Sequence, residues 1–161
     1  MFGNNAKIID LTKLKVGYTF SLDRITWKII EVAQYYWTMD NTTIEYTITT
    51  GDKKAYLEVE YTKGQYEITY SESILINDAF LIDALQSNQI MHNNNLFEFD
   101  KKYSGDYKNL TTHSNRENLE SFLFYAKNDD LLTIEKWADG SYEVFLGEDI
   151  KAKKIKKIKE N

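Results

Sequence analysis

The stretch Ile44 to Tyr70 reads I-E-Y-T-I-T-T-G-D-K-K-A-Y-L-E-V-E-Y-T-K-G-Q-Y-E-I-T-Y. Apolar and polar residues alternate in it with period two over three runs, residues 44–50, 55–61 and 65–70. Such alternation is typical of strands that bury one face. Gly51 and Gly64 stand between the runs, and glycine accepts the left-handed backbone of tight hairpin turns. The stretch therefore predicts an antiparallel meander.

The same alternation continues on both sides of this meander. It predicts further strands at residues 18–22, 27–36, 96–103, 121–126, 131–137 and 141–146. The run 27–36 has mixed periodicity, as a bulged strand would have. Phe122 to Tyr125 is apolar on both faces, which predicts a covered central strand. Residues 77–86 have helical spacing, and the polar segments 87–95 and 107–118 are predicted loops.

The composition of the 161 residues is that of a globular protein, with 42% hydrophobic and 28% charged residues. Its 12 Tyr, 8 Phe and 3 Trp favour sheet. The absence of Cys excludes disulfides, a thiolate nucleophile and a zinc–thiolate site, and it favours a reducing compartment. No apolar run reaches the ~18 residues of a transmembrane helix, and the first five residues lack the features of a signal peptide. We therefore expect a cytoplasmic protein.

Charge is distributed unevenly along the chain. The net charge is −5, yet residues 151–161 carry six Lys and one Glu. The rest of the chain is therefore strongly acidic. Nucleic-acid binding requires a basic face over the domain, so we expect no nucleic-acid partner.

Two segments of the chain resemble each other. Leu57 to Glu72 aligns with Leu132 to Glu148 when one residue is inserted in the turn. Polar identities match along with the apolar ones, as in Glu67 with Glu143, and this favours an internal repeat. The alternative is that any two hairpins with a glycine turn look alike. At the offset of 75 residues that relates Leu57 to Leu132, Glu45 falls opposite Glu120.

Short motifs in both halves resemble a known bacterial family, catalogued as domain of unknown function 4178. They are L-K-V-G at 14–17, W-K-I-I-E-V from Trp27, E-Y-T-I-T-T-G from Glu45, a Tyr-Ser-Gly loop at 103–105, L-T-I-E-K-W at 132–137 and E-V-F-L-G at 143–147. The resemblance covers nearly the whole chain and includes no catalytic signature. It implies a small cytoplasmic β domain without an assigned activity, in a family sometimes linked with membrane-stress or transport-related genes.

These observations predict one globular domain over residues 1–161, mostly β, with at most one short helix. Its two similar antiparallel halves, residues 14–73 and 90–150, pack as a sandwich or as barrel-like sheets. We expect Leu57, Val59, Leu132 and Ile134 in the core. Residues 156–161 form a basic tail.

The sequence contains no recognisable catalytic or cofactor motif. His92 and His113 lie in predicted loops without metal-ligand spacing, so solvated histidines are the simpler interpretation. No nucleophile elbow and no phosphate-binding glycine loop occurs. We therefore expect no cofactor, no metal and no catalytic residue.

Two sets of residues remain as a candidate surface. The first set is two pairs of glutamates that the repeat aligns, Glu45 with Glu120 and Glu60 with Glu135. Each pair would act in acid–base chemistry if the fold brought its two carboxyls together. Each glutamate would otherwise lie on an outward strand face opposite Lys or Thr. The aromatic residues Tyr35, Tyr36, Trp37 and Trp137 either form a binding surface or divide between core and rim.

The C-terminal segment offers a third possibility, because Ile155 and Ile158 among lysines form a weak membrane anchor. We expect an ordered segment to about Ile155 and a solvated, dispensable end after it. The leading interpretation is a non-catalytic protein- or ligand-binding or scaffold module, with a protein partner and a homo-oligomer left open. The alternatives are a carboxylate-dependent hydrolase and a membrane-surface adaptor acting through the tail.

Overall fold

The three runs of the quoted stretch form strands that pair in chain order. They are β3 (Thr42–Thr49), β4 (Lys54–Thr62) and β5 (Gln65–Ile74). The structure is a computed structural model that describes residues 8–161. The other strands in this part are β1 (Thr19–Leu22), β2 (Ile25–Trp37), β6 (Gln89–His92), β7 (Asn95–Asn109), β8 (Glu117–Ala126), β9 (Leu131–Trp137), β10 (Tyr142–Ile150) and β11 (Lys156–Lys159). The helical segments are α1 (Asp78–Ser87) and the 3-10 turns η1 (Leu11–Lys13) and η2 (Ala152–Lys154).

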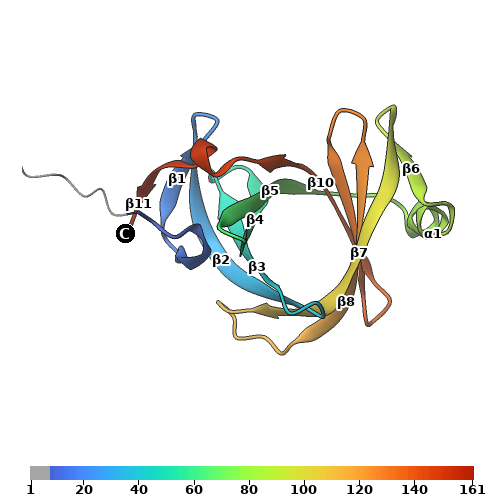
Figure 1. Ribbon diagram of the computed structural model, residues 1–161, viewed down its shortest axis with the longest axis horizontal. Coiled ribbons are helices and arrows are strands. Elements are labelled where there is room, and N and C mark those ends of the chain that lie inside the picture. The colour runs from blue at the N-terminus through green and yellow to red at the C-terminus, as the bar shows by residue number, and fades with distance from the viewer. Residues whose placement is uncertain (1–7) are drawn as a thin grey trace, which may run out of the picture.

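The eleven strands of residues 8–161 belong to one antiparallel sheet in the order β11-β1-β2-β3-β4-β5-β10-β9-β8-β7-β6. Strand β2 also pairs with β7, so the eight strands from β2 to β7 in this order close into a ring. Figure 1 looks through the ring, with β1 and β11 outside it on one side and β6 with α1 on the other. The predicted class, mostly β with antiparallel pairing and one short helix, is confirmed, and the arrangement is barrel-like rather than a sandwich.

A bulge in each long strand moves side chains from outside the ring to inside it. In β2 the register shifts between Ile29 and Glu31, as the mixed periodicity of this run predicted. Ile29 packs in an outer apolar cluster, whereas Glu31 lines the ring interior. In β7 the shift lies between Phe99 and Lys101, and Lys101 likewise lines the interior. An extra residue in a strand reverses the alternation beyond it, which explains how one strand serves two environments.

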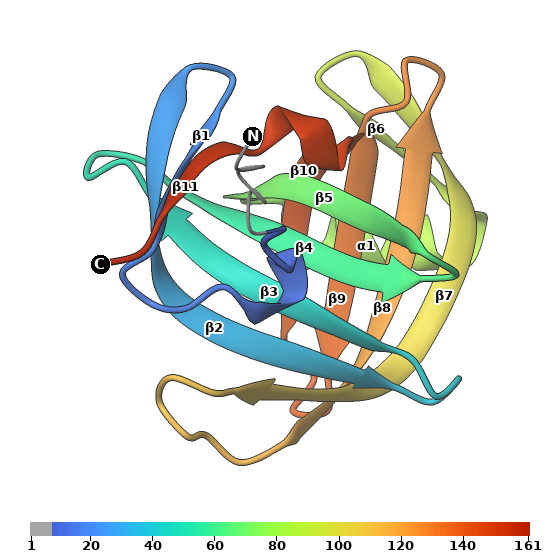
Figure 2. The same ribbon diagram turned by 60° about the vertical axis from the view of Figure 1, so that its left-hand side comes forward.

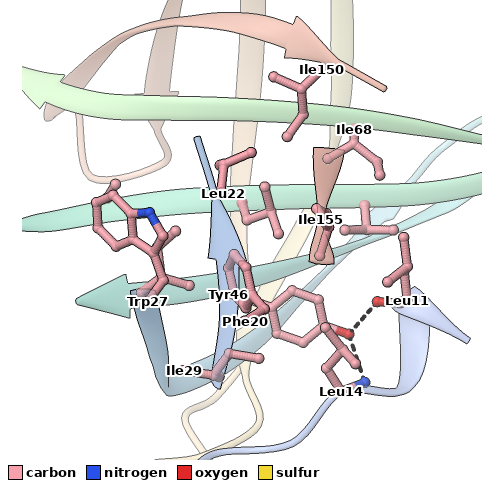
Figure 3. Close-up of a cluster of buried hydrophobic side chains, with 14 residues drawn as sticks. Leu11, Leu14, Phe20, Leu22, Trp27, Ile29, Tyr46, Ile68, Ile150 and Ile155 are labelled. Carbon is pink, nitrogen blue, oxygen red and sulfur yellow. Dashed lines mark hydrogen bonds between the residues drawn. The ribbon is translucent and has the colours of Figure 1, made fainter. Parts of the chain in front are cut away.

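The first apolar cluster, cluster 1, lies outside the ring and contains Phe20, Trp27, Tyr46, Leu57 and Ile155 among its buried residues. It fills the space between the outer faces of β2 to β5 and the segments η1, β1 and β11. Figure 3 shows the Tyr46 hydroxyl in this cluster, donating to the Leu11 carbonyl at 2.8 Å and accepting from the Leu14 N–H at 3.1 Å. These bonds fix η1 over the cluster while satisfying a buried hydroxyl.

The second apolar cluster, cluster 2, lies outside the opposite part of the ring. Helix α1 places Leu81 and Ala84 against Phe97, Phe124 and Leu132, which are buried. The helix begins after Asn77, whose side chain accepts the Ala79 N–H at 3.0 Å as an N-cap, and it ends at Asn88 in the left-handed conformation. The predicted helix is confirmed with a boundary shift of one residue at each end. The four predicted core residues, Leu57, Val59, Leu132 and Ile134, are all buried.

The two hairpins that resemble each other in sequence also pair in the same register. Val59 lies opposite Ile68 and Glu60 opposite Glu67 in β4–β5. The aligned residues of β9–β10, Ile134 with Val144 and Glu135 with Glu143, are likewise opposite each other. Tyr66 and Tyr142 thus occupy matching positions.

The two halves of the ring meet at two seams, β2–β7 and β5–β10, and each seam contains a closely packed glycine. Gly105 lies opposite Trp37, and Gly147 lies opposite Ser71. A Cβ on Gly105 would lie 2.9 Å from the Trp37 Cα, and one on Gly147 would lie 2.8 Å from the Ser71 Cα. Any larger residue would displace backbone, so glycine is required at both seams.

Three expectations are wrong in detail. Residues 89–92, predicted as loop, form β6, because a short strand with one buried apolar residue, Ile90, gives almost no alternation signal. The Tyr-Ser-Gly segment at 103–105 lies inside β7, which runs to Asn109 rather than ending in a loop. The end of the chain is paired, because β11 forms a ladder with β1 as Figure 2 shows.

Candidate functional site

The inner face of the ring is polar and aromatic, although the outer faces of the same strands are aliphatic. Alternation explains this contrast, because Leu57 and Val59 of β4 face cluster 1 while Glu58 and Glu60 face the interior. In β9, Leu132 and Ile134 face cluster 2, and Thr133 faces the interior. The two apolar clusters therefore lie outside the ring, and the inner face is mainly polar and aromatic, with a few aliphatic residues such as Leu123 and Leu131.

A buried cluster of Tyr35, Glu45 and Glu135 occupies the middle of the ring. The Tyr35 hydroxyl lies 3.0 Å from Glu45 Oε2 and 2.9 Å from Glu135 Oε1. The three side chains are exposed to only 2%, 6% and 2%. One hydroxyl carries one proton, so it can donate to only one of the two carboxyls. The other contact needs a protonated carboxyl as donor.

The electrostatics of this cluster favour protonation. Burial raises the pKa of the Glu45 and Glu135 carboxyls well above their usual value, and the charge of Glu58 acts in the same direction. Burial also raises the pKa of Glu58, which pairs with Glu45 across β3–β4, to about 7. The pKa of the Tyr35 hydroxyl is raised for the same reason. Near neutral pH the interior therefore holds carboxyls that release a proton when a positive charge approaches.

Glu135 has an unsatisfied oxygen. Its Oε2 is buried and has no hydrogen-bond partner, and the same is true of Asn41 Oδ1. A buried acceptor without a partner costs roughly 1–3 kcal/mol. Both atoms are acceptors, and Asn41 lines the cavity at one end of the ring, where a donor group from a ligand could satisfy its Oδ1.

One end of the ring opens into a cavity of about 470 Å³, which we call the Trp37 pocket. Its aromatic lining includes Trp37, Tyr103 and Tyr125. Its charged lining residues are Lys101 and the acidic residues Glu58, Glu60, Glu67, Asp100 and Asp149. Carboxylates thus outnumber cations five to one in this pocket.

The other end opens into a cavity of about 340 Å³, which we call the Trp137 pocket. Tyr35, Tyr107 and Trp137 are among its aromatic lining residues. Its charged lining residues are Lys54 and the acidic residues Glu31, Glu45, Glu117, Asp139 and Glu143. This pocket repeats the five-to-one excess of carboxylates.

A line of aromatic rings connects the two pockets. Tyr35 stacks on Trp37 with centroids 5.0 Å apart and planes 6° from parallel. Tyr107 contacts Tyr35 at 5.1 Å and Trp137 at 5.4 Å, edge to face in both contacts. These rings present faces and edges beside the carboxylates over the length of the interior. Aromatic faces attract cations.

The structure separates the carboxylate pairs that the repeat suggested. Glu45 lies in the ring, whereas Glu120 is on the outer face and forms an ion pair with Lys102. Glu60 accepts from Asn41 Nδ2 at 2.8 Å in the Trp37 pocket, and Glu135 contacts Tyr35 instead. The residues that do meet, Glu45 and Glu135, come one from each predicted pair.

The aromatic candidates divide between the two sides of the sheet. Tyr35, Trp37 and Trp137 line the interior, while Tyr36 is stacked under the Arg116 guanidinium at 3.9 Å. Of the histidines, His92 borders a groove beside α1 and His113 is exposed. Glu58 and Tyr107 were missed as site residues. Glu58 has the same parity as Glu60, so the alternation of β4 already placed it on the same face.

One family model matches the chain over residues 15–152, with the description "Domain of unknown function (DUF4178)". No curated protein and no solved structure matches it. No helix of residues 8–161 has the length and apolar character needed to cross a membrane.

Proposed function

The chain belongs to the DUF4178 family, and from its geometry we propose that it is a non-catalytic binding module whose ring interior holds an organic cation. The observation that carries the proposal is the charge of the interior. Each pocket has five acidic residues and one lysine among its lining residues, so each stays negative even when Glu58 in one and Glu45 in the other are protonated. A ligand with amine or guanidinium groups would neutralise this excess.

Such a ligand matches the other features of the interior. Ammonium and guanidinium groups are donors only, and two of the three buried atoms without a partner, Glu135 Oε2 and Asn41 Oδ1, are acceptors, while the third, Trp137 Nε1, is a donor. The faces of Trp37, Tyr107 and Trp137 add cation–π attraction, worth roughly 0.5–2 kcal/mol per contact. The pocket volumes of about 470 and 340 Å³ suit small molecules.

Binding should release protons. A cation beside Glu45, Glu58 and Glu135 stabilises their charged forms and lowers their raised pKa values. Affinity for a cation then rises with pH through about 7, where Glu58 titrates. A protein that bound cations only through surface carboxylates would show no such dependence above pH 6, because ordinary carboxyls are already ionised there.

The two alternatives have less support. A carboxylate-dependent hydrolase needs its acid and base at one open position, and Glu45 and Glu120 lie on opposite faces of the sheet. A membrane-surface adaptor needs free apolar side chains in the tail. Ile155 is buried in cluster 1, and Ile158 packs against it.

We also propose that the two halves arose by duplication. The shared register of the β4–β5 and β9–β10 hairpins supports this. So does the order of elements, since each half has a helical turn, a short outer strand and four ring strands.

Calorimetric titration of the full chain with spermidine at pH 6 and pH 8 tests the ligand class. We expect tighter binding at pH 8 and at least a fivefold loss in Glu60→Gln, whose carboxylate lines the Trp37 pocket. Glu148→Gln is the matched control, because this exposed residue lies on the outer face of β10. Equal loss in both variants, or binding that is independent of pH, would show general charge attraction and contradict the proposal.

A further inference from the structure

The outer hairpins of the two halves have the same construction. In β1–β2 the turn residues Asp23 and Arg24 have φ of 49° and 66°, and in β6–β7 Asn93 and Asn94 have φ of 47° and 63°. Two positive φ values define the same tight turn in both hairpins. In each hairpin, the β-bulge comes at an equal distance after the turn. The position of Gln89 and Met91 in β6 therefore corresponds to that of Thr19 and Ser21 in β1.

One of these hairpins has a covered edge. Strand β11 lies antiparallel along β1, with Lys159 opposite Thr19 and Lys156 opposite Ser21. Ile155 at its start is buried in cluster 1. Figure 2 shows β11 running beside β1 on the side away from β2.

The corresponding edge of β6 is open. Among residues 8–161, β6 pairs only with β7. In a two-residue hairpin the residues next to the turn exchange hydrogen bonds, and so does every second pair beyond them. His92 and Ile90 thus bond to β7, while Gln89 and Met91 direct their N–H and C=O groups outward, where, in the described part of the chain, the Gln89 carbonyl accepts only from the Ser87 hydroxyl at 3.2 Å. Unpaired edges of this kind accept an added strand.

An apolar groove borders this edge. It has a volume of about 500 Å³ between α1 and β6, and Ile76, Phe80, Met91 and Leu96 are among its lining residues. Phe80 and Met91 are exposed to 67% and 63%. The groove thus lies beside β6 in the way that the cluster 1 position of Ile155 lies beside β1.

The charge around β6 indicates the occupant. The groove beside β6 has an acidic residue and no lysine or arginine among its lining residues. Asp83 lines the groove, and Glu98 lies opposite Gln89. A basic segment with an apolar residue is the complementary partner, whereas a second β6 edge would bring like charges together.

We propose that the open edge of β6 binds an extended, lysine-bearing segment of a partner protein as an added antiparallel strand, with an aliphatic side chain in the α1–β6 groove. The pairing of Lys156–Lys159 with β1 is an example, within the molecule itself, of the strand addition proposed for β6. The site is separate from the ring interior and does not depend on the ligand proposed for it.

The test titrates the ¹⁵N-labelled full chain with a synthetic peptide of residues 151–161. We expect the amide signals of Gln89 and Met91 to shift and to become protected from hydrogen exchange. Met91→Pro should weaken binding at least tenfold, since it removes the outward N–H, while Met91→Ala, which keeps it, is the matched control. A peptide N-methylated at alternate residues should not bind, which serves as a second measurement if the proline variant does not fold.

Each other outcome would overturn the proposal. Shifts confined to Thr19 and Ser21 would mean exchange with β11, and shifts at Tyr35 or Trp37 would mean capture of a cation by the ring. Unchanged binding in Met91→Pro would exclude strand addition. A concentration-dependent dimer that Met91→Pro abolishes would make a second copy the occupant instead.

Discussion

The outer and inner faces of the ring are built from the same strands but carry different kinds of side chain. The outer faces bury aliphatic side chains such as Leu132 and Ile134 in clusters 1 and 2. The inner face carries carboxyls and aromatic rings, including a glutamate with an unsatisfied buried oxygen. Under the proposed function, stability depends on the outer faces and binding on the inner face of one sheet, so residues adjacent in sequence should respond differently to mutation.

The largest contrast is expected between two neighbours in β9. Leu132→Ala should lower the free energy of unfolding by about 2–5 kcal/mol, the usual cost of truncating a buried leucine. Thr133→Ala removes an interior side chain that lines the Trp37 pocket, and it should cost about 1 kcal/mol or less. Urea denaturation of both variants measures the difference. Equal losses would show that the interior is a second structural core.

The interior should also make stability depend on pH. The carboxyls of Glu45, Glu58 and Glu135 have pKa values raised above that of the unfolded chain. The folded protein therefore binds more protons than the unfolded chain in this range, and the contribution to stability is fully present below about pH 4.5 and is lost as pH rises through about 7. The rise from 4.5 to about 7 at Glu58 alone corresponds to roughly 3 kcal/mol.

Thermal melts of the ligand-free protein between pH 5 and pH 8 should show this decline. Glu135→Gln removes one of the carboxyls and should flatten the curve. Glu148→Gln, on the outer face, should leave it unchanged. A melting temperature that rises toward pH 8 would contradict the electrostatics assigned to the ring.

A smaller loss is expected at the seams, where the two faces are held in register. Gly147→Ala would place a Cβ 2.8 Å from the Ser71 Cα, and the strands would have to separate. Overpacking of this kind costs about 1–3 kcal/mol. Gly140→Ala is an instructive control, because it meets no atom within 4 Å and only its backbone conformation, φ 87°, opposes the change. Chemical denaturation of both variants measures the two costs. A lower cooperativity of unfolding in Gly147→Ala, in addition to lower stability, would distinguish its steric cost from the conformational cost of Gly140→Ala.

The sequence predicted local structure better than it predicted the ring. Alternation placed Leu57 and Val59 correctly because a strand with one apolar face leaves a period-two signal in the chain itself. The closing pair β2–β7 joins residues such as Tyr35 and Tyr107, and nothing in either segment specifies the other. Strand β6 was missed for a related reason, since only one of its four residues is buried.

The sequence predicted only part of the glutamate cluster, because the repeat alignment placed one glutamate on the wrong face of its strand. The repeat aligned Glu45 with Glu120 at an offset of 75 residues, taken from Leu57 and Leu132. In the structure Tyr46 lies opposite Leu57 and Phe124 opposite Leu132, so the offset for these strands is 78. An odd error of three residues moves a side chain to the other face. Glu120 therefore lies outside the ring, and the partner that the cluster uses is Glu135.

The smallest effect concerns the C-terminal strand, which belongs to the outer face. A chain ending at Ile155 keeps the buried isoleucine of cluster 1 but loses β11 and the partly buried Ile158. The ladder to β1 is short and exposed, and the net value of a typical hydrogen bond is only about 0.5–1.5 kcal/mol. We therefore expect a loss of about 1 kcal/mol in unfolding free energy rather than none. The truncated chain also exposes the edge of β1, so it should bind the peptide of residues 151–161 at Thr19 and Ser21, whereas we expect the full chain to bind it at β6. Sedimentation with anionic liposomes at physiological salt should not differ between the two chains, since neither has free apolar side chains in the tail. Liposome binding that disappears on truncation would instead show that β11 leaves β1 and acts as a membrane anchor.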